Sequence, residues 1–278
     1  MDPIALLMVV TGSVAHMGWN LLAKNASSQV TFLWLAAAPV ALISLACCPW
    51  ILPRLDQTAL LCIGASGTVH AGYFFFLGRA YRTGNISFVY PYCRGIGAVL
   101  ATLFSVTLLG ERPSWLGWVG IALTVVAPLV ELGRPQKNVD RKTVLLTLST
   151  ALCIGAYLTI DAVGVRQVAA QDYVLGLWVP FFILLAPMAL ADGPVMPLLR
   201  RPQRVLIGGL CMAVGYALVL AAMRVAPLGY VVAARSTGIL LSGVCGRLFF
   251  AEQVTRRRWL AIALISAGIT CIGLAPSR

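Results

Sequence analysis

Apolar residues fall along the chain in ten blocks, each about as long as the roughly 20 helical residues that cross a hydrocarbon core. The blocks cover residues 4–23, 30–50, 58–78, 86–108, 115–132, 143–163, 173–191, 203–222, 228–247 and 258–274. Only 11% of the residues are charged, whereas a water-soluble domain carries roughly a quarter. The blocks also lack the polar–apolar alternation of membrane-barrel strands. The sequence therefore predicts an all-α integral membrane protein with ten transmembrane helices.

The first block would be removed if it belonged to a signal peptide, which needs a positively charged start and a cleavage site of small residues. The chain begins with Met1, Asp2 and Pro3, without a positive charge, and no clear small-residue site follows. We therefore expect residues 4–23 to form a retained helix.

The formal net charge of +12 resides mainly in short loops between the blocks. The loops after odd-numbered blocks, with their edges, hold 14 basic residues: Lys24, Arg79, Arg82, Arg134, Lys137, Arg141, Lys142, Arg200, Arg201, Arg204, Arg247, Arg256, Arg257 and Arg258. The other side holds 5: Arg54, Arg112, Arg166, Arg224 and Arg278. Because basic loops stay cytoplasmic, we predict that both termini lie outside. The charge then indicates topology and contact with anionic lipid head groups, not nucleic-acid binding.

The eight cysteines lie within or at the edges of the apolar blocks, and no two of them form a C-x-x-C pair: Cys47, Cys48, Cys62, Cys93, Cys153, Cys211, Cys245 and Cys271. This pattern is typical of buried free thiols rather than of a disulfide framework or a zinc site. We predict no metal site and no cofactor.

The two halves of the chain share residues at a nearly constant spacing. A shift of 141 residues pairs Arg94 with Arg235, Gly97 with Gly238, Glu111 with Glu252 and Trp118 with Trp259, and a shift of 138 pairs Gly18 with Ala156 and Trp19 with Tyr157. Five helices per half is an odd number, so the second half would enter the membrane from the opposite face, as in the inverted repeats of secondary transporters. We predict five-helix repeats at 1–135 and 136–278, joined through the hydrophilic stretch 133–142.

Three short motifs resemble those of the drug/metabolite transporter superfamily, specifically its EamA-type ten-helix members. They are HMGWNLLAK at residues 16–24, Leu109-Gly110-Glu111 before the fifth block, and Phe250-Ala251-Glu252 before the tenth. The resemblance implies a secondary transporter; members export amino acids and related metabolites, and relatives carry sugar phosphates, nucleotide sugars or choline. The second half departs from the pattern, since an alanine precedes Glu252 and the basic run 256–258 has no counterpart in the first half.

Arg94 and Arg235 are basic residues inside predicted spans, where a charge is expensive unless it faces a cavity or a partner. Each lies seven or eight residues into its block, roughly 12 Å deep at 1.5 Å per residue, and so near the middle of a core of about 30 Å. A pair of guanidiniums suits a carboxylate or phosphate, which arginine holds with two parallel hydrogen bonds. The alternative is that they pair with helix ends, carbonyls or Asp161 and only join the halves.

Aromatic and polar side chains recur at helical spacing in several blocks. His16, Trp19 and Asn20 share one helix face, and His70, Tyr73 and Phe74 repeat that spacing. We predict a substrate-binding wall from Trp19, Asn20, Tyr73, Tyr90, Tyr157 and Tyr216. The alternative for each of them is interhelical packing with satisfied hydrogen bonds.

Titratable groups within the spans could couple transport to a proton gradient. The candidates are His16, His70 and Asp161, although an acid near the end of its span, as Asp161 is, could instead reach the membrane surface. No carboxylate occupies the first block, where the small multidrug members of the same superfamily place theirs, and this counts against antiport of that type.

Glu111 and Glu252 each follow one block and precede the next. A carboxylate there can cap the coming helix and interact with its positive dipole end, so we assign both a structural role. Trp115, Trp118 and Trp259 are expected to lie at the membrane interfaces.

These features favour a secondary transporter for a small anionic or zwitterionic metabolite, working by alternating access at a central cavity between the repeats. The alternatives are an exporter or flippase of amphipathic or cationic compounds, and a receptor or assembly subunit that does not transport. We do not expect an enzyme, since no nucleophile–base set and no H-E-x-x-H motif is present. Its expected partners are a small-molecule substrate and the lipid bilayer, its expected location is the plasma (inner) membrane of a bacterium, as a multi-pass protein, and a monomer or homodimer is expected.

Overall fold

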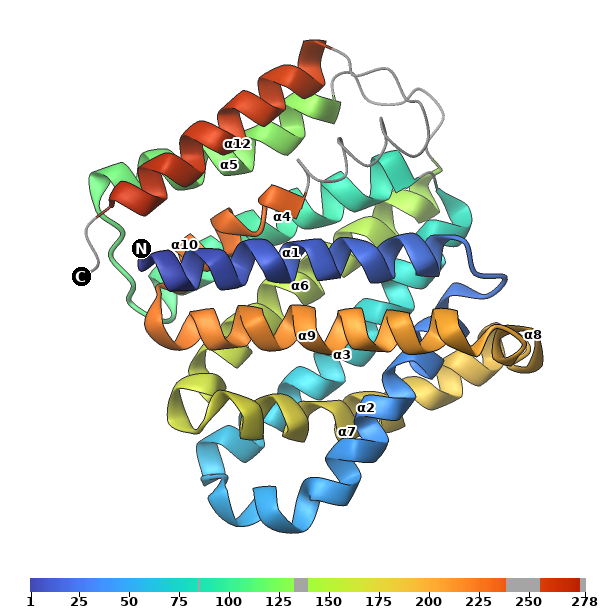
Figure 1. Ribbon diagram of the computed structural model, residues 1–278. Coiled ribbons are helices and arrows are strands. Elements are labelled where there is room, and N and C mark those ends of the chain that lie inside the picture. The colour runs from blue at the N-terminus through green and yellow to red at the C-terminus, as the bar shows by residue number, and fades with distance from the viewer. Residues whose placement is uncertain (85, 133–139, 239–255, 276–278) are drawn as a thin grey trace.

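The computed structural model describes residues 1–84, 86–132, 140–238 and 256–275, and every regular element among them is a helix. The helices are α1 (Pro3–Lys24), α2 (Gln29–Ile51), the 3₁₀ turn η1 (Leu52–Arg54), α3 (Gln57–Thr83), α4 (Ile86–Thr107), α5 (Trp115–Leu132), α6 (Arg141–Gln167), α7 (Ala170–Asp192), α8 (Met196–Leu199), α9 (Pro202–Val225), α10 (Leu228–Ala234) and α12 (Arg256–Leu274). Figure 1 shows them as one bundle, with both chain ends on the same side. The all-α prediction is confirmed.

Six of the described helices are long and apolar enough to cross a membrane: α1, α2, α3, α6, α7 and α9. Shorter apolar stretches lie in the fourth, fifth and tenth predicted spans, at Tyr92–Thr107, Trp115–Ala127 and Trp259–Ile272. Of the predicted ninth span, α10 covers only the first seven residues, and much of the remainder lies outside the described residues. The described part of the chain thus supports a multi-pass helical membrane protein.

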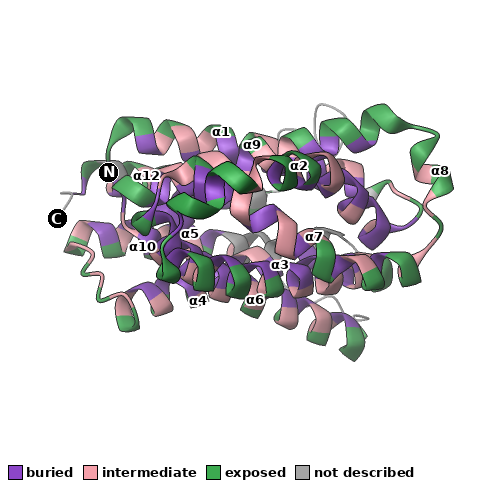
Figure 2. Cartoon of the chain, turned by 90° about the horizontal axis from the view of Figure 1, so that it is seen from below, coloured by how far each residue is buried: buried purple, intermediate pink, exposed green. Residues whose placement is uncertain are grey.

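The long helices are apolar on every face, so they bury one side against their neighbours and expose apolar side chains on the other. Large apolar residues such as Leu7, Leu61 and Leu210 are more than 60% exposed, and Figure 2 shows exposed residues on the outer faces of the bundle. Trp115 and Trp259 are exposed near the starts of α5 and α12. Such a surface is suited to lipid rather than to water.

Helices from the two halves of the chain pack directly against each other. α1 lies against α9, α3 and α4 against α6, α2 against α7 and α9, and α5 against α12. In Figure 1 the neighbours α1 and α9 run in opposite directions. Small residues permit this approach: a Cβ on Gly12 of α1 would lie 2.8 Å from the carbonyl oxygen of Gly215 in α9.

At one end of the bundle, the carboxylate of Glu111 connects the two halves of the chain. The sequence predicted that it would instead cap the next helix. Its oxygens accept hydrogen bonds from the backbone N–H groups of Leu228 (2.8 Å) and Gly229 (3.2 Å), and it pairs with Arg166 at 2.9 Å. Glu111 therefore caps α10 rather than the coming helix α5. The cap of α5 is Ser114, whose hydroxyl accepts from the N–H of Gly117 at 3.2 Å.

The turn before Glu111 explains this change of partner. Gly110 has a φ of +66°, a left-handed conformation that is strained for residues with a Cβ. The turn places Glu111 at the start of α10. Ser114, three residues after Glu111, caps α5. A cap between distant segments holds the two halves of the chain together more firmly than a local cap would.

Replacing Glu111 with alanine is expected to lower the stability of the protein by on the order of 1–3 kcal/mol, because two backbone donors and a guanidinium lose their acceptor. The apparent melting temperature in one detergent measures the effect. Asp2→Ala is the matched control, since Asp2 caps the exposed end of α1 through the N–H of Ile4 and should matter less. Equal melting temperatures for Glu111→Ala and the wild type would contradict the assigned role.

The opposite end of the bundle is joined by Asp192, the last residue of α7. One of its oxygens lies 3.7 Å from Nε of Arg79 and 3.4 Å from Nη1 of Arg82, both in α3. The other accepts from the hydroxyl of Ser28 and from the N–H of Val30 (3.2 Å) at the start of α2. Each end of the bundle is thus closed by one carboxylate that caps a helix from the other half.

Candidate functional site

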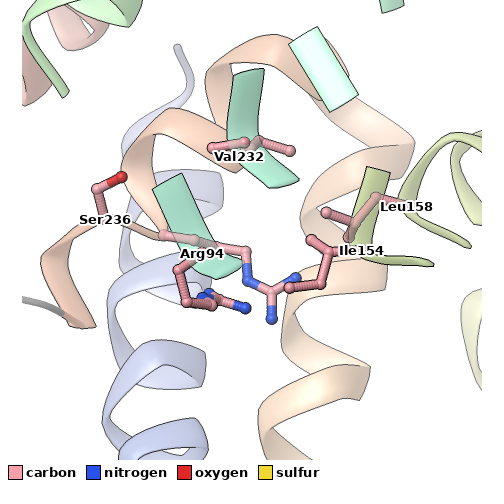
Figure 3. A pocket seen from close by; sticks show the side chains of 7 residues that line it. Arg94, Ile154, Leu158, Val232 and Ser236 are labelled. Atoms are coloured by element: carbon pink, nitrogen blue, oxygen red, sulfur yellow. The ribbon is translucent and has the colours of Figure 1, made fainter. Parts of the chain in front are cut away.

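Arg94 and Arg235, both predicted to bind substrate, line the same small cavity inside the bundle. Figure 3 shows this cavity with Arg94 labelled. Arg94 belongs to α4, and Arg235 follows the last residue of α10. The other lining residues carry no charge: Ala98, Ile154, Leu158, Val232 and Ser236. The cavity has a volume of about 10 Å³, close to the minimum that holds one water molecule. The centre of the bundle is therefore closed in this structure.

The backbone leaves the α-helical pattern at Arg235. The N–H of Ser236 donates to the carbonyl of Ala233 (3.0 Å), and the N–H of Gly238 donates to the carbonyl of Arg235 (3.1 Å). These are i→i+3 bonds of a tighter turn. The hydroxyl of Ser13 in α1 also lies 3.5 Å from the Arg235 carbonyl. Interrupted helices at the membrane midplane are a common feature of transporter binding sites.

Neither central arginine has an acidic partner among the described residues. The four ion pairs found there all involve other cations, namely Arg54, Arg79, Arg82 and Arg166. Arg235 is only 3% exposed, and its Nε and Nη1 atoms are buried without a hydrogen-bond partner in the described structure. The predicted alternative, an ion pair with Asp161, does not form.

His16 lies between Arg94 and Trp19 and cannot satisfy both. The indole N–H of Trp19 is 3.2 Å from Nδ1 of His16, and Nη1 of Arg94 is 3.5 Å from Nε2. A neutral imidazole has one acceptor nitrogen, so His16 can accept a hydrogen bond from only one of these two donors. Together with Arg235, this makes the centre rich in hydrogen-bond donors and poor in acceptors.

A second cavity, of about 30 Å³, includes His16, the residue that contacts Arg94. It is lined mainly by aromatic rings: His16, Trp19, His70, Tyr73, Phe74, Tyr157, Leu177, Trp178, Phe181, Met212 and Tyr216. The rings of His70 and Tyr157 have centroids 4.0 Å apart. Nδ1 of His70 lies 2.9 Å from the Ser66 carbonyl and would donate its proton there. Nε2 is then the acceptor of the ring.

Asp161 is fully buried, and this overturns the alternative that it reaches the membrane surface. Its carboxylate accepts hydrogen bonds from the hydroxyls of Tyr173 (2.7 Å) and Tyr216. Tyr216 lines the aromatic cavity, so a single side chain separates the carboxylate from the cavity.

Two predicted wall residues lie elsewhere. Asn20 donates to the carbonyl of His16 (2.8 Å) and accepts from Tyr81 (3.1 Å), so it holds its helix in place. Tyr90 packs in a separate apolar cluster with Met17, Ala127, Ala261 and Ile265. Neither residue lines the aromatic cavity, and both make the interhelical contacts that the packing alternative predicts.

Four residues of the aromatic cavity were not predicted from the sequence: Leu177, Trp178, Phe181 and Met212. Three of them are apolar residues in helices that are apolar on every side. The sequence therefore does not show whether they face a cavity, a neighbouring helix or lipid. Trp178 offers a weak signal, because its indole N–H needs a partner when buried. That nitrogen is buried without a partner among the described residues.

Some predicted residues cannot be placed. Glu252, Cys245 and Arg247 lie outside the described residues. The seven cysteines within the described ranges are free thiols. In the same ranges, no group of three or more His, Cys, Asp or Glu side chains could hold a metal ion.

An all-helical bundle with apolar outer faces and a buried, donor-rich centre is a multi-pass membrane protein. Residues 141–274 match the EamA-like transporter family, in agreement with the resemblance inferred from the motifs. The chain is also similar to a protein of known crystal structure, with a TM-score of 0.74, 19% identity, and coverage of 96% of this chain and 95% of the other. At this identity the similarity concerns the fold alone. No curated protein matches the chain.

Proposed function

We propose that the protein is a secondary transporter of the drug/metabolite type and carries a small anionic or zwitterionic solute by alternating access. One observation carries the proposal: Arg94 and Arg235 line one buried cavity without an acidic partner among the described residues. A buried charge left unpaired is strongly unfavourable, and a carboxylate or phosphate between the two guanidiniums would remove this cost.

The aromatic cavity favours a solute with a second, apolar or cationic part. Aromatic faces attract an ammonium group and also pack against planar apolar groups, and Nε2 of His70 is an available acceptor. A zwitterion would place its carboxylate at the arginines and its ammonium group among the rings. A purely cationic compound, the alternative substrate, would be repelled by Arg94 and Arg235.

Alternating access needs two halves that can move against each other, and we propose that they are inverted repeats at 1–135 and 136–278. Matching α1–α5 with α6, α7, α9, α10 and α12 turns most of the contacts between helices into other observed contacts. The pair α1 with α9 becomes α6 with α3, and α3 with α7 becomes α9 with α2. The pairs α2 with α7 and α5 with α12 map onto themselves. This pattern supports a two-fold relation between the halves.

We further propose that Asp161 carries the proton that couples transport to a gradient. It is the fully buried carboxylate of the described core, and Tyr216 connects it to the aromatic cavity. His16 and His70 line that cavity too, but both nitrogens of His16 already contact Trp19 and Arg94, and Nε2 of His70 is the acceptor that we assign to the solute.

Transport by the purified protein in proteoliposomes tests the proposed function. We expect anionic or zwitterionic metabolites to raise the melting temperature in a substrate screen, because ligands stabilise the state that binds them, and the same compounds to be taken up. Binding without uptake would favour the receptor alternative. Stabilisation by organic cations alone, with matching uptake, would favour the exporter of cationic compounds.

We propose that the protein lies in the plasma (inner) membrane with both termini outside, as the distribution of basic residues predicts. On a cysteine-free background, a cysteine at position 140 should resist an impermeant thiol reagent in intact cells, and one at position 56 should react. Rapid labelling at position 140 with protection at position 56 would reverse the assigned orientation.

A further inference from the structure

A third cavity, of about 210 Å³, lies away from the arginine pair, where α1, α2, α8 and α9 meet. Its polar lining includes Asn25, Ser27, Arg201 and Arg204, and buried Phe32 and Val205 form an apolar part. It opens at the end of the bundle that carries most of the basic residues. A cavity with cationic and apolar sides suits an amphipathic anion.

The two arginines of this cavity, Arg201 and Arg204, have exposed side chains that are available to a ligand. Among the described residues, the guanidiniums of Arg201 and Arg204 form no hydrogen bond or ion pair. Arg201 precedes α9, and no side chain caps that helix, so the positive end of the helix dipole adds to the positive potential. An anion in the cavity would contact two guanidiniums near this helix end.

The surroundings of the cavity favour an anion that carries acyl chains. Leu206, Ile207 and Leu210 of α9 follow directly after Arg204 and are more than 50% exposed. Met196 and Leu199 of α8 are also exposed apolar residues. These side chains continue from the arginines along the lipid-facing surface, where acyl chains would lie.

We propose that this cavity binds the phosphate group of an anionic phospholipid, with Arg201 and Arg204 as its ligands. Basic cavities between helices on the cytoplasmic side of a membrane suit such head groups, and arginine holds phosphate with two parallel hydrogen bonds. The exposed face of α9 would contact the acyl chains. The site is separate from the central cavity and does not depend on the proposed transport activity.

The test is native mass spectrometry of the purified full-length protein in a neutral detergent, titrated with dioleoylphosphatidylglycerol. Dioleoylphosphatidylcholine has the same tails without net charge, and glycerol 3-phosphate is a phosphate ester without tails. We expect phosphatidylglycerol to bind best. The double variant R201A/R204A should weaken its binding roughly 30-fold, about fivefold for each arginine.

Two further variants make the result specific. R256A/R257A removes the same charge from exposed positions of α12 and should weaken binding by at most about threefold, since distant surface charges are screened. Ser27→Trp keeps all charges and fills the cavity, so it should weaken binding as R201A/R204A does, and it serves as the test if the double variant does not fold. Equal binding of the two lipids, equal effects of the two double variants, or glycerol 3-phosphate binding as tightly as the lipid would each overturn the proposal.

Discussion

Replacing Arg94 or Arg235 with alanine is expected to weaken solute binding by roughly 30-fold or more, the equivalent of about 2 kcal/mol for a desolvated, bidentate contact. Lysine keeps the charge but loses the planar fork, so Arg94→Lys and Arg235→Lys should show intermediate affinities. Transport affinity and melting temperature should be measured on the same purified variants. Arg224→Ala, which removes an exposed arginine at the end of α9, is the control and should bind normally.

A structural role for these arginines predicts the opposite pattern. Alanine would then lower the melting temperature, and the surviving protein would transport with ordinary affinity. The buried, unpartnered nitrogens of Arg235 permit a sharper test with methionine, which has a similar length and no charge. Without solute, Arg235→Met should raise the melting temperature, because an uncompensated buried charge is removed, and solute should no longer stabilise the variant. Normal affinity in both alanine variants would refute the anion site and favour binding by the aromatic cavity alone.

Replacing Asp161 with asparagine is expected to abolish accumulation driven by a pH gradient, so that the inside-to-outside ratio of solute falls to about one. Asparagine has nearly the shape of aspartate and can still accept a hydrogen bond from Tyr216 or Tyr173, but it cannot bind and release a proton. Exchange of labelled for unlabelled solute across the membrane should therefore continue. The measurement compares uptake with and without an imposed gradient in proteoliposomes.

Asp172→Asn is the matched control for Asp161→Asn. Asp172 is also buried, but it pairs with Arg54 at 3.7 Å near the start of α7, away from the aromatic cavity. This variant should keep its response to the gradient. If Asp161→Asn still accumulates solute when a gradient is imposed, another group carries the coupling proton, and His70 would be tested next.

The centre of the bundle is closed in this structure, so solute binding requires a change of conformation. Neither central cavity, at about 10 and 30 Å³, can hold a metabolite without movement of the surrounding helices. Glu111 connects helices at one end of the bundle and Asp192 at the other, so we expect solute binding from either side to require one of these connections to open. Variants of Glu111 and Asp192 should therefore change transport rates even though both lie outside the cavities.

The sequence by itself determined the class of the protein and the most unusual residues of its centre. Long apolar blocks can satisfy their backbone groups in a bilayer only as helices, so the all-helical fold follows from local composition. Arg94 and Arg235 could be identified because a charge in an apolar block is conspicuous whatever surrounds it. Both line the central cavity of the structure.

The contacts that the functional side chains make with distant helices were decided only by the tertiary structure. The sequence assigned Glu111 to the next helix, but the turn at Gly110 brings it to α10, more than 100 residues away. Asp161 meets Tyr216 from α9, which no local spacing predicts. Asn20 and Tyr90, which the sequence also predicted for the wall, do not line the aromatic cavity and contact other helices. In a chain that is apolar on every helix face, the pattern of residues cannot distinguish lipid from neighbour or cavity, and only the packing of distant segments does so.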